Sequence, residues 1–461
     1  MKVFLIYLSN WYSFTIVFLL RQHSTIAVLA KNRIVRDPIY GFISLSHYDF
    51  IQEIVDTAYF QRLRRLCQLG VSAYVYPGAT HSRLSHVLGA MELFTRVYDN
   101  LTRDTSESAE QTLKARKLGA AAVLLHDIGH GPLSHASEAI FDFKHVAITN
   151  AIIRETEIGD ILSKSDIEPS EVTDIISRIS PEHTILTQLT SSQLDLDRLD
   201  YLARDMYFTG VGFGRIDSER ITRMMQIYKA PGSPIHGHVV TNNKGLFSLE
   251  SYILSRHLMH EAVYFHKATR CIELMIKSLF QRAKWLAQEK GFELPAEIQL
   301  LSQPNGVDWK AIVGLDDHII FSIILKWMKN DDPILKDLST RIIDRKLLKG
   351  IEIPQTAIRK YVDSIKKIEK ALIDSGFDPA YYTTLDDPKH LPYSPYSPKA
   401  PDDKTTVITN IFVLDSFGKP KEISQLSPTV EALAKYQYNF RLYVPDKCLA
   451  QTLSTLDMEG E

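Results

Sequence analysis

Cysteine is scarce in this chain of 461 residues, which contains only Cys67, Cys271 and Cys448. Three scattered thiols provide neither a disulfide framework nor a zinc site built from cysteine. The chain therefore fits a reducing compartment, and we expect it in the cytoplasm. Any metal site should instead use histidine and carboxylate ligands.

A strong net charge of either sign is also missing. The formal net charge at pH 7 is −2, which does not support a generally basic surface that binds nucleic acid. Single-stranded nucleic acid is therefore an unsupported partner, whereas a local basic pocket for phosphates stays open. Hydrophobic residues make up 45% of the chain and charged residues 23%, which is ordinary for a folded globular protein.

An apolar run from Val3 to Leu20, between Lys2 and Arg21, opens the chain. A signal peptide or a membrane anchor would have this pattern, but polar residues interrupt the run and no small-residue cleavage site follows. We favour a third interpretation, a start codon placed too far upstream, with the folded protein beginning near Lys31. We expect no stable membrane partner.

Helical periodicity dominates the chain from about residue 50 to residue 375. The clearest predicted helices span residues 81–101, 111–126, 195–206 and 251–279. Short extended pieces over 31–50 precede them. A hairpin is predicted over 236–249, because Asn242-Asn243-Lys244-Gly245 has the composition of a turn.

The C-terminal part has a different composition. Residues 386–404 are rich in proline, serine and charge, which predicts a linker. Strands over 405–416 and 440–445 and a short helix near Thr429 to Ala434 follow. The predicted fold class is mainly α, with a helical core and a small α/β C-terminal lobe. The predicted units are an N-terminal extension (1–30), a catalytic core (31–275), a helical extension (276–385), and a linker with the C-terminal lobe (386–461).

The strongest chemical signal is AAVLLHDIGHGPLSH, at residues 121–135. A buried apolar helix would deliver His126 and Asp127 side by side before Gly129 ends it. Imidazole nitrogen and carboxylate oxygen suit a first-row divalent metal. Two more ligands are needed, and His86 and Asp197 are the best candidates. Each of these two alone would more often be a structural histidine or a helix cap.

Two polar stripes at helical spacing accompany this motif. The first consists of Asp197, Tyr201 and Asp205. The second row consists of Arg256, His260, Tyr264 and Lys267. A solvated helix face would explain either stripe, but a mixture of arginine, histidine and tyrosine is also what a pocket for phosphate and sugar requires.

The motifs in their order resemble those of a known family, the HD-domain deoxynucleoside triphosphate triphosphohydrolases. The similarity is greatest to the branch that contains the SAM-and-HD-domain enzymes, although no SAM domain precedes the core here. The matching stretches between about residues 33 and 270 are DPIYGFI, FQRLRRLCQLG, YPGATHSRLSHVLG, LLHDIGHGPLSH, LDRLDYLARD and RHLMHEAVYFHKA. An HD dipeptide alone would mean little, whereas six ordered motifs are specific.

The resemblance implies a divalent metal (Mn, Fe, Mg, Co or Zn) that is held by His86, His126, Asp127 and Asp197. It also implies hydrolysis of deoxynucleoside triphosphates to deoxynucleoside and triphosphate. The catalytic cluster of the family falls on His130, His135, Glu138 and His145, where Glu138 replaces an aspartate of the SAM-and-HD enzymes. We expect His135 to donate the proton to the leaving oxygen, with Glu138 orienting it. His130 and His145 are alternatives.

The resemblance further implies a substrate-binding set. Tyr264 would pack under the sugar and leave little room for a 2′-hydroxyl, while Gln68 and Asp205 would bind the 3′-hydroxyl. Arg198 stands where the SAM-and-HD enzymes have lysine. The full set is Gln68, Leu69, Arg83, Arg198, Tyr201, Asp205, Arg256, His260, Tyr264 and Lys267.

A regulatory nucleotide site and self-association are also implied. Asp56, Gln61 and Arg64 match residues that read guanine at the activator site between subunits of the SAM-and-HD enzymes, whereas Arg36 replaces an asparagine there. The activator would be GTP or a dNTP. An ordinary polar surface helix would explain the same residues. Because family members assemble as dimers, tetramers or hexamers, we expect a homo-oligomer.

Two alternative functions stay open at this point. Another HD phosphohydrolase, such as a nucleotidase, a cyclic-dinucleotide phosphodiesterase or a guanosine-tetraphosphate hydrolase, would share the metal site. The chain lacks the Gly-Tyr-Pro motif of the cyclic-dinucleotide branch. A binding protein that has lost catalysis is the second alternative. Only the favoured activity would release intact triphosphate.

Overall fold

The structure is a computed structural model that describes residues 33–104, 108–180, 182–213, 216–233, 236–299, 308–387, 389–390, 393–394, 409–435, 437–438 and 440–456. The apolar N-terminal run and most of the predicted linker lie outside these residues. In the part that is described, no helix combines the length and the hydrophobicity that crossing a membrane requires.

The described chain begins with an antiparallel hairpin of β1 (Ile34–Asp37) and β2 (Gly41–Ser44), as the predicted extended pieces require. Short helical segments follow: α2 (Asp49–Asp56), α3 (Ala58–Gln61), η1 (Arg62–Arg65) and η2 (Ser72–Tyr74). Thr57 caps α3 with its hydroxyl, which accepts from the backbone N–H of Phe60.

A helical domain surrounds α4, whose side chains are buried along most of its length. Its helices are α4 (Arg83–Leu101), α5 (Ala109–Leu125), α6 (His135–Phe141), α7 (His145–Glu155), α8 (Glu157–Lys164), α9 (Pro169–Ile176), α10 (Thr184–Thr190) and α11 (Leu196–Thr209). Ser108 and Gln111 form a capping box at the start of α5, and Asp195 caps α11. The helices predicted over 81–101, 111–126 and 195–206 are confirmed, with ends shifted by up to three residues.

The long helix predicted over 251–279 is wrong, because the structure divides it. Helix α13 (Leu246–Met259) runs into a π-helical turn, η4 (His260–Tyr264), and α14 (Lys267–Lys290) then starts at a new N-cap, His266. A π turn shifts the register of the backbone hydrogen bonds and often marks a functional site. The helical periodicity continues on both sides, so it did not reveal the break.

The hairpin turn predicted at Asn242–Gly245 is also wrong. These residues form a 3-10 turn, η3 (Asn243–Gly245), in which the Asn242 side chain accepts from the N–H of Lys244 before α13 begins. The strand β4 (Val239–Thr241) pairs instead with the earlier β3 (Met225–Ile227). Asparagine and glycine are common at helix starts as well as in hairpin turns, so their presence did not distinguish the two structures.

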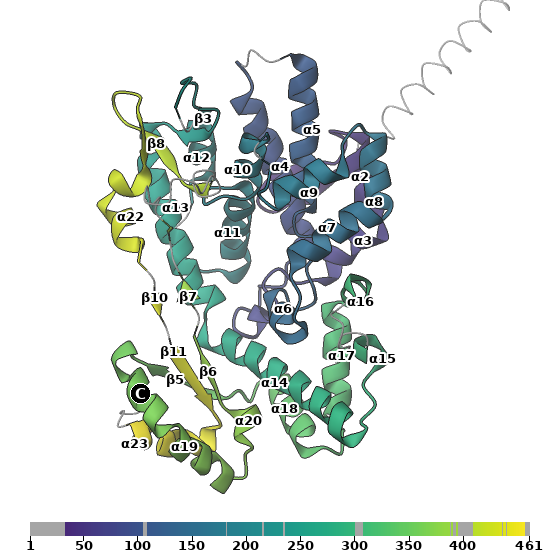
Figure 1. The fold of residues 1–461 in the computed structure, drawn as a ribbon, viewed down its shortest axis with the longest axis vertical. Helices are drawn as coiled ribbons and strands as arrows, with labels where there is room; N and C mark the ends of the chain where they lie inside the picture. The colour runs from purple at the N-terminus through teal and green to yellow at the C-terminus, as the bar shows by residue number, and fades with distance from the viewer. Residues whose placement is uncertain are drawn as a thin grey trace, which may run out of the picture.

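The rest of the chain lies in two places: α14 runs beneath α6 with α17 and α18 beside it, whereas α12 and α22 pack against α13 (Figure 1). Its helices are α12 (Ser218–Met224), α15 (Ala296–Gln299), α16 (Trp309–Val313), α17 (Asp317–Trp327), α18 (Pro333–Ile343), η6 (Gln355–Ala357), α19 (Ile358–Asp374), α20 (Pro379–Tyr382), η7 (Ile423–Gln425), α22 (Pro428–Leu433), η8 (Asp446–Cys448) and α23 (Leu449–Leu456). Its other strands are β5 (Lys349–Ile353), β6 (Thr384–Asp386), β7 (Lys389–His390), β8 (Phe412–Leu414), β9 (Pro420–Glu422), β10 (Gln437–Tyr438) and β11 (Phe440–Val444).

The C-terminal strands are shared between several small sheets. β8 pairs with β9 and also, in parallel, with β4, whereas β11 lies between β5 and β6. β10 pairs with β7. One hydrophobic cluster extends from Ile43 to Leu456, so the described C-terminal elements share the core of the helices. The predicted fold class, mainly α with a small α/β part at the C-terminus, is confirmed; the predicted domain boundaries stay predictions.

Candidate metal centre and substrate pocket

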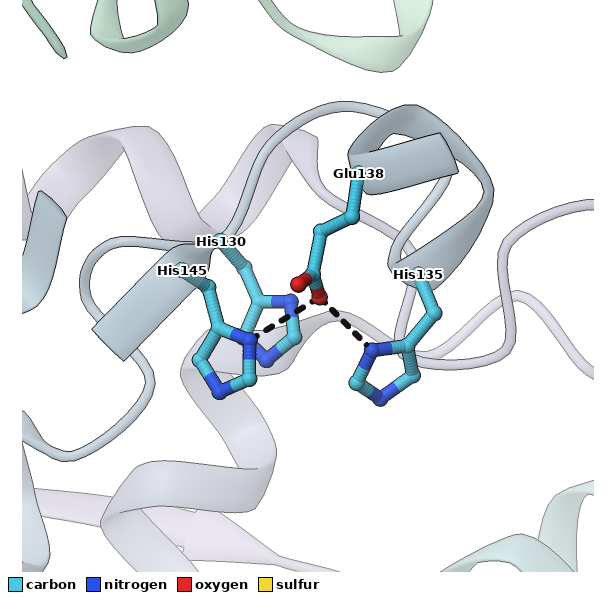
Figure 2. A group of neighbouring side chains, drawn as sticks. All are labelled: His130, His135, Glu138 and His145. Atoms are coloured by element: carbon cyan, nitrogen blue, oxygen red, sulfur yellow. Dashed lines mark hydrogen bonds and ion pairs between the residues drawn. The ribbon is translucent and has the colours of Figure 1, made fainter. Parts of the chain in front are cut away.

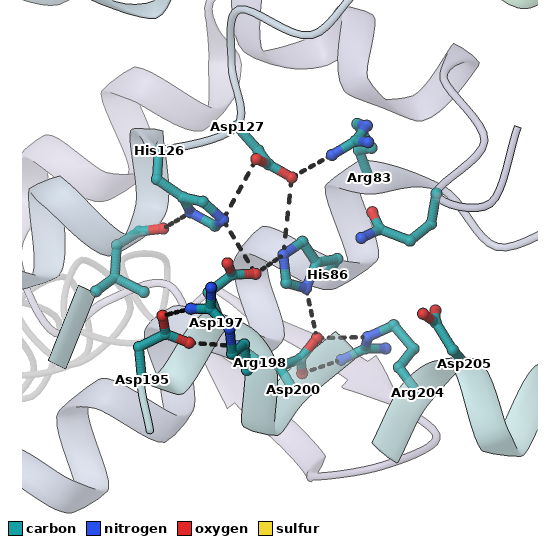
Figure 3. A network of polar contacts seen from close by, with 12 residues as sticks. Arg83, His86, His126, Asp127, Asp195, Asp197, Arg198, Asp200, Arg204 and Asp205 are labelled. Carbon is teal, nitrogen blue, oxygen red and sulfur yellow. Dashed lines mark hydrogen bonds and ion pairs between the residues drawn. The ribbon is translucent and has the colours of Figure 1, made fainter. Parts of the chain in front are cut away.

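Three helices bring the predicted metal ligands together. His86 lies in the second turn of α4, His126 and Asp127 directly follow α5, and Asp197 lies in the first turn of α11 (Figure 3). His86 Nε2 lies 3.1 Å from Asp197 Oδ1 and 3.8 Å from Asp127 Oδ2. His126 Nε2 lies 3.5 Å from a carboxylate oxygen of each aspartate.

The orientation of both imidazoles fits metal binding. His86 Nδ1 donates to Asp200 Oδ2 at 2.8 Å, and His126 Nδ1 donates to the carbonyl of Val123 at 2.7 Å. Each Nε2 atom is therefore left to carry a lone pair. Among the described residues, both buried Nε2 atoms lack a hydrogen-bond partner of good geometry. The donor set of two imidazoles and two carboxylates thus suits a divalent first-row cation.

The electrostatics of this centre favour a cation. Burial alone would raise the pKa of the Asp127 carboxyl, but the charges of Arg83 and His126 and the hydrogen bond from His130 hold it well below its usual range. Burial opposes the charged form of His86, yet Asp197 and Asp200 raise the pKa of His86 to about 10, so its Nε2 binds a proton unless a metal ion takes that place. The carboxylates are therefore ionised and attract positive charge to the Nε2 atoms.

A second cluster lies beside the metal centre and consists of the predicted catalytic residues (Figure 2). Glu138 Oε1 accepts from both His135 Nδ1 and His145 Nδ1, at 2.9 Å each. The His130 ring stacks on His145 with centroids 3.9 Å apart, and its Nε2 lies 3.2 Å from Asp127 Oδ1. His130 thus connects the two clusters. Burial and the neighbouring Arg83 lower the pKa of His130 well below its usual value, so its ring is neutral.

Both clusters open into one cavity of about 830 Å³. This volume is large enough for a nucleotide-sized ligand. The predicted site residues that line it are Gln68, Leu69, Arg83, His126, Asp127, His130, His135, His145, Asp197, Arg198, Tyr201, Asp205, His260 and Tyr264. His86 and Glu138 lie behind this lining and contact it through the interactions above.

The end of the cavity that is formed by η4 contains the predicted sugar-binding group. The Tyr264 hydroxyl donates to Asp205 Oδ2 at 2.8 Å, and His81 Nε2 donates to Asp205 Oδ1 at the same distance. Burial, and then the charge of Asp205, raise the pKa of Tyr264 well above its usual value. The Tyr264 ring makes edge contacts with His260 and Tyr201. His260 and Tyr264, the first and last residues of the π turn, therefore both line the cavity.

Two of the predicted phosphate-binding arginines have buried, unused donors. Arg83 donates to Asp127 and to Ser134 Oγ, and Arg198 donates to Asp195 and to the carbonyl of Ser192. The Nε atoms of both arginines are buried and lack a hydrogen-bond partner among the described residues. Buried donors of this kind are normally satisfied, which points to an anionic ligand.

The predicted substrate residues Arg256 and Lys267 are not part of the cavity lining. Arg256 is partly buried on α13, and Lys267 is exposed at the first position of α14, where its carbonyl accepts from the Tyr443 hydroxyl. The break after η4 places α14 on a new axis, so the stripe that continued from Tyr264 to Lys267 in the sequence does not continue in space.

Three cationic residues that the sequence interpretation missed line the cavity: Arg178, Arg270 and Lys277. Arg270 and Lys277 are seven residues apart on α14 and share one helix face. A sequence analysis that placed the start of α14 at Lys267 could have predicted this pair of cationic residues. Arg178 has a left-handed backbone conformation, with φ of 62°. No sequence motif marks Arg178.

The predicted regulatory residues lie on the surface formed by α2, α3 and η1. Asp56 accepts two hydrogen bonds from Arg33 Nη1, at 2.6 and 2.7 Å. Gln61 accepts from Arg64 Nε at 2.7 Å and donates to the carbonyl of Val55 at 2.6 Å. None of the three lines the 830 Å³ cavity, and their regulatory role stays a prediction.

Fold and site together define the class of this protein, a metal-binding phosphohydrolase with a mainly helical catalytic domain. Comparisons with known proteins give the family. The model of the HD domain matches residues 83–205, and the model of the HD associated region matches residues 216–452. The chain therefore belongs to the HD-domain phosphohydrolases. The resemblance inferred from the six motifs is confirmed.

Similar proteins come from bacteria and eukaryotes. The Bacillus subtilis protein YwfO is 34% identical over 90% of this chain and 93% of its own length. A deoxynucleoside triphosphate triphosphohydrolase SAMHD1 homolog from Dictyostelium discoideum is 30% identical over 59% of this chain and 54% of its own. The crystal structure of a phosphohydrolase from Bacteroides thetaiotaomicron is similar with a TM-score of 0.74 at 29% identity, and it covers 90% of this chain and 99% of that chain.

Proposed function

We propose that this protein hydrolyses deoxynucleoside triphosphates to deoxynucleoside and triphosphate. The observation that carries the proposal is the composition of the cavity of about 830 Å³. Its metal-binding wall adjoins the histidine cluster, and its other end presents the hydrogen-bonded pair of Asp205 and Tyr264. The relatives named as deoxynucleoside triphosphate triphosphohydrolases support the same substrate class.

The residues of this chain have separate tasks in the proposed reaction. A divalent cation held by His86, His126, Asp127 and Asp197 would supply a Lewis acid for the phosphates and acidify water. The buried Nε donors of Arg83 and Arg198 would offset phosphate charge.

The other end of the cavity would recognise the sugar. The buried oxygen Gln68 Oε1, which lacks a hydrogen-bond partner among the described residues, would accept from a sugar hydroxyl. The ring of Tyr264 is fixed by Asp205 and would contact the sugar face. The leaving 5′-oxygen needs a proton, for which the Glu138-bound histidines are the candidates.

The products test the proposal directly. We expect the full-length protein to convert dNTPs, singly or mixed, to deoxynucleoside and intact triphosphate in the presence of Mn or Mg. EDTA should abolish turnover, and added Mn should restore it. Ion-exchange chromatography separates these products from mono- and diphosphates. Mono- or diphosphate products would assign the site to another HD phosphohydrolase reaction, and no turnover in any mixture would indicate a binding protein.

Discrimination against ribonucleotides should depend on the Tyr264 ring. In Tyr264→Ala, we expect the ratio of dNTP to NTP turnover to fall by roughly 10- to 100-fold, because the space for a 2′-hydroxyl opens. Tyr264→Phe is the matched variant: it keeps the ring, loses the hydrogen bond to Asp205, and should retain the preference for deoxynucleotides. Competition assays with paired dNTP and NTP measure the ratio. Equal ratios in wild type and Tyr264→Ala would contradict the steric role of the ring.

A further inference from the structure

Two loops on the cavity wall hold residues that contact the substrate space. The first loop carries Gln68 and Leu69, and the second loop leads from the metal motif through Ser134 to α6. Leu133 and Ser134 have φ of 59° and 60°. Residues with side chains rarely adopt this conformation, and it persists only where surrounding contacts hold it.

The two loops also lie against one another. A Cβ at Gly70 would come within 2.9 Å of the carbonyl oxygen of Leu133. The Ser134 hydroxyl donates to the carbonyl of Gln68 at 3.2 Å. Arg83, the partner of Asp127, donates to the same hydroxyl. A displacement of either loop would therefore move both a substrate-facing residue and a partner of the metal ligand.

A carboxylate from a distant helix holds both loops. Asp317 is the first residue of α17, and its side chain is buried. Its Oδ1 accepts from the backbone N–H of Leu133 at 2.7 Å, and its Oδ2 accepts from the backbone N–H of Cys67 at 2.8 Å. Only a carboxylate provides two acceptor oxygens for two N–H groups, since an amide has one. The position at the helix start also favours the negative charge.

A second contact joins the same segments. The buried guanidinium of Arg62 donates to the carbonyl of His130 at 2.6 Å and to the carbonyl of Leu315 at 3.0 Å. The loop that contains His130 is thus attached to the turn that precedes α17. The neighbouring Asp316 instead caps α17 and pairs with Arg65 at 2.6 Å. The capping of the helix and the holding of the loops are therefore divided between two adjacent aspartates.

We propose that Asp317 is a positioning residue, which orders the loops of Gln68 and Ser134 so that the HD-associated region completes the substrate pocket. The inference rests on the proposed function for its effect on turnover, but the ordering of the loops does not depend on the substrate. Asp317 itself does not line the cavity. It acts through the backbone of Cys67 and Leu133.

The test compares Asp317→Asn with a matched control, Asp332→Asn. Asp332 caps α18 in the same region, accepts from the N–H groups of Ile334 and Leu335, and pairs with Arg282. For Asp317→Asn we expect hydrogen exchange of the amides of Cys67 and Leu133 to accelerate roughly tenfold or more. We expect kcat/KM for dNTP to fall on the order of 10²-fold. Mn affinity and the thermal midpoint should stay close to those of the control.

Each outcome decides the matter. Faster exchange at both amides together with a lower kcat/KM, while Asp332→Asn shows neither, supports the inference, and partial recovery in Asp317→Glu would add to it. Exchange and kcat/KM that match the control would overturn it, as would faster exchange with unchanged kcat/KM. If the wild type turns over no nucleotide, the proposed function fails, and exchange at the two amides alone still decides whether Asp317 orders the loops.

Discussion

Replacing Asp127 with asparagine is expected to reduce hydrolysis by on the order of 10³-fold or more and to weaken Mn binding. The Asp127 carboxylate lies within 3.8 Å of Nε2 of both His86 and His126 and also binds Arg83. Asparagine keeps the volume of the side chain but removes its charge. The loss therefore reports on the cation rather than on a cavity in the core. Initial rates and a calorimetric titration with Mn measure the two effects.

Asp332→Asn again provides the control, because the two carboxylates are similarly buried and each pairs with an arginine. The side chains of Asp127 and Asp332 are 10% and 12% exposed. Asp332 lies outside the cavity lining, so its variant should keep wild-type turnover and Mn affinity. An Asp127→Asn protein that bound Mn and turned over substrate like the control would show that Asp127 is not a metal ligand.

The candidate metal ligands could be selected from the sequence because their strongest signal is local. His126 and Asp127 are adjacent, and the glycines and the proline that follow cannot continue a buried helix. His86 and Asp197 each lie near the start of a helix with a strong apolar pattern. The ordered motifs then supplied the correspondence between these separate helices. Local pattern and family order together were sufficient to select four side chains that the structure brings together, and their role as metal ligands stays a prediction.

The sequence could not reveal features that depend on backbone geometry. The π turn at His260–Tyr264 changes the helix register without changing the composition, so the predicted stripe includes Lys267, which does not line the cavity. Arg178 lines the cavity, and its own backbone has a positive φ. The contact of Asp317 with Cys67 and Leu133 joins residues 250 and 184 positions apart. No periodicity encodes a pairing of that separation.

The sequence also could not reveal which strands pair, because pairing joins residues that are far apart in the chain. The alternating pattern of Phe440–Val444 predicts a strand, but a pattern does not state its neighbours. In the structure this strand lies between β5 and β6, and β8 extends the sheet of β3 and β4. The described C-terminal strands thereby join the core that supports α14, which contributes the partly buried Arg270 and Lys277 to the cavity.

Replacing His135 with glutamine is expected to lower kcat by about 10²- to 10⁴-fold, the range typical of general acid catalysis. The side chain of His135 is 73% exposed at the cavity, and its Nδ1 donates to Glu138. That hydrogen bond leaves Nε2 on the side of the ring that is turned away from Glu138 (Figure 2). Because His135 is not one of the four predicted metal ligands, Mn affinity should stay unchanged. Single-turnover kinetics and Mn titration measure the two quantities.

Glu138 orients His135 but also binds His145 at the same distance of 2.9 Å. We therefore expect Glu138→Gln to lower kcat less than His135→Gln does. The double variant should be about as slow as His135→Gln alone, since residues that act as one unit are not additive. His145→Gln is the matched variant, because it removes the other partner of the same carboxylate. If it were the slow variant while His135→Gln kept most of its turnover, His145 would be the acid.

A substrate whose leaving group needs no proton separates acid catalysis from mere positioning. Bis-p-nitrophenyl phosphate releases a stable phenolate, so a missing general acid should matter little for it. We expect the defect of His135→Gln to shrink at least tenfold with this substrate, while Asp127→Asn stays inactive because the metal centre serves both substrates. A His135→Gln defect of equal size on both substrates would contradict proton donation. It would indicate that His135, like Glu138, contributes through the arrangement of the cluster.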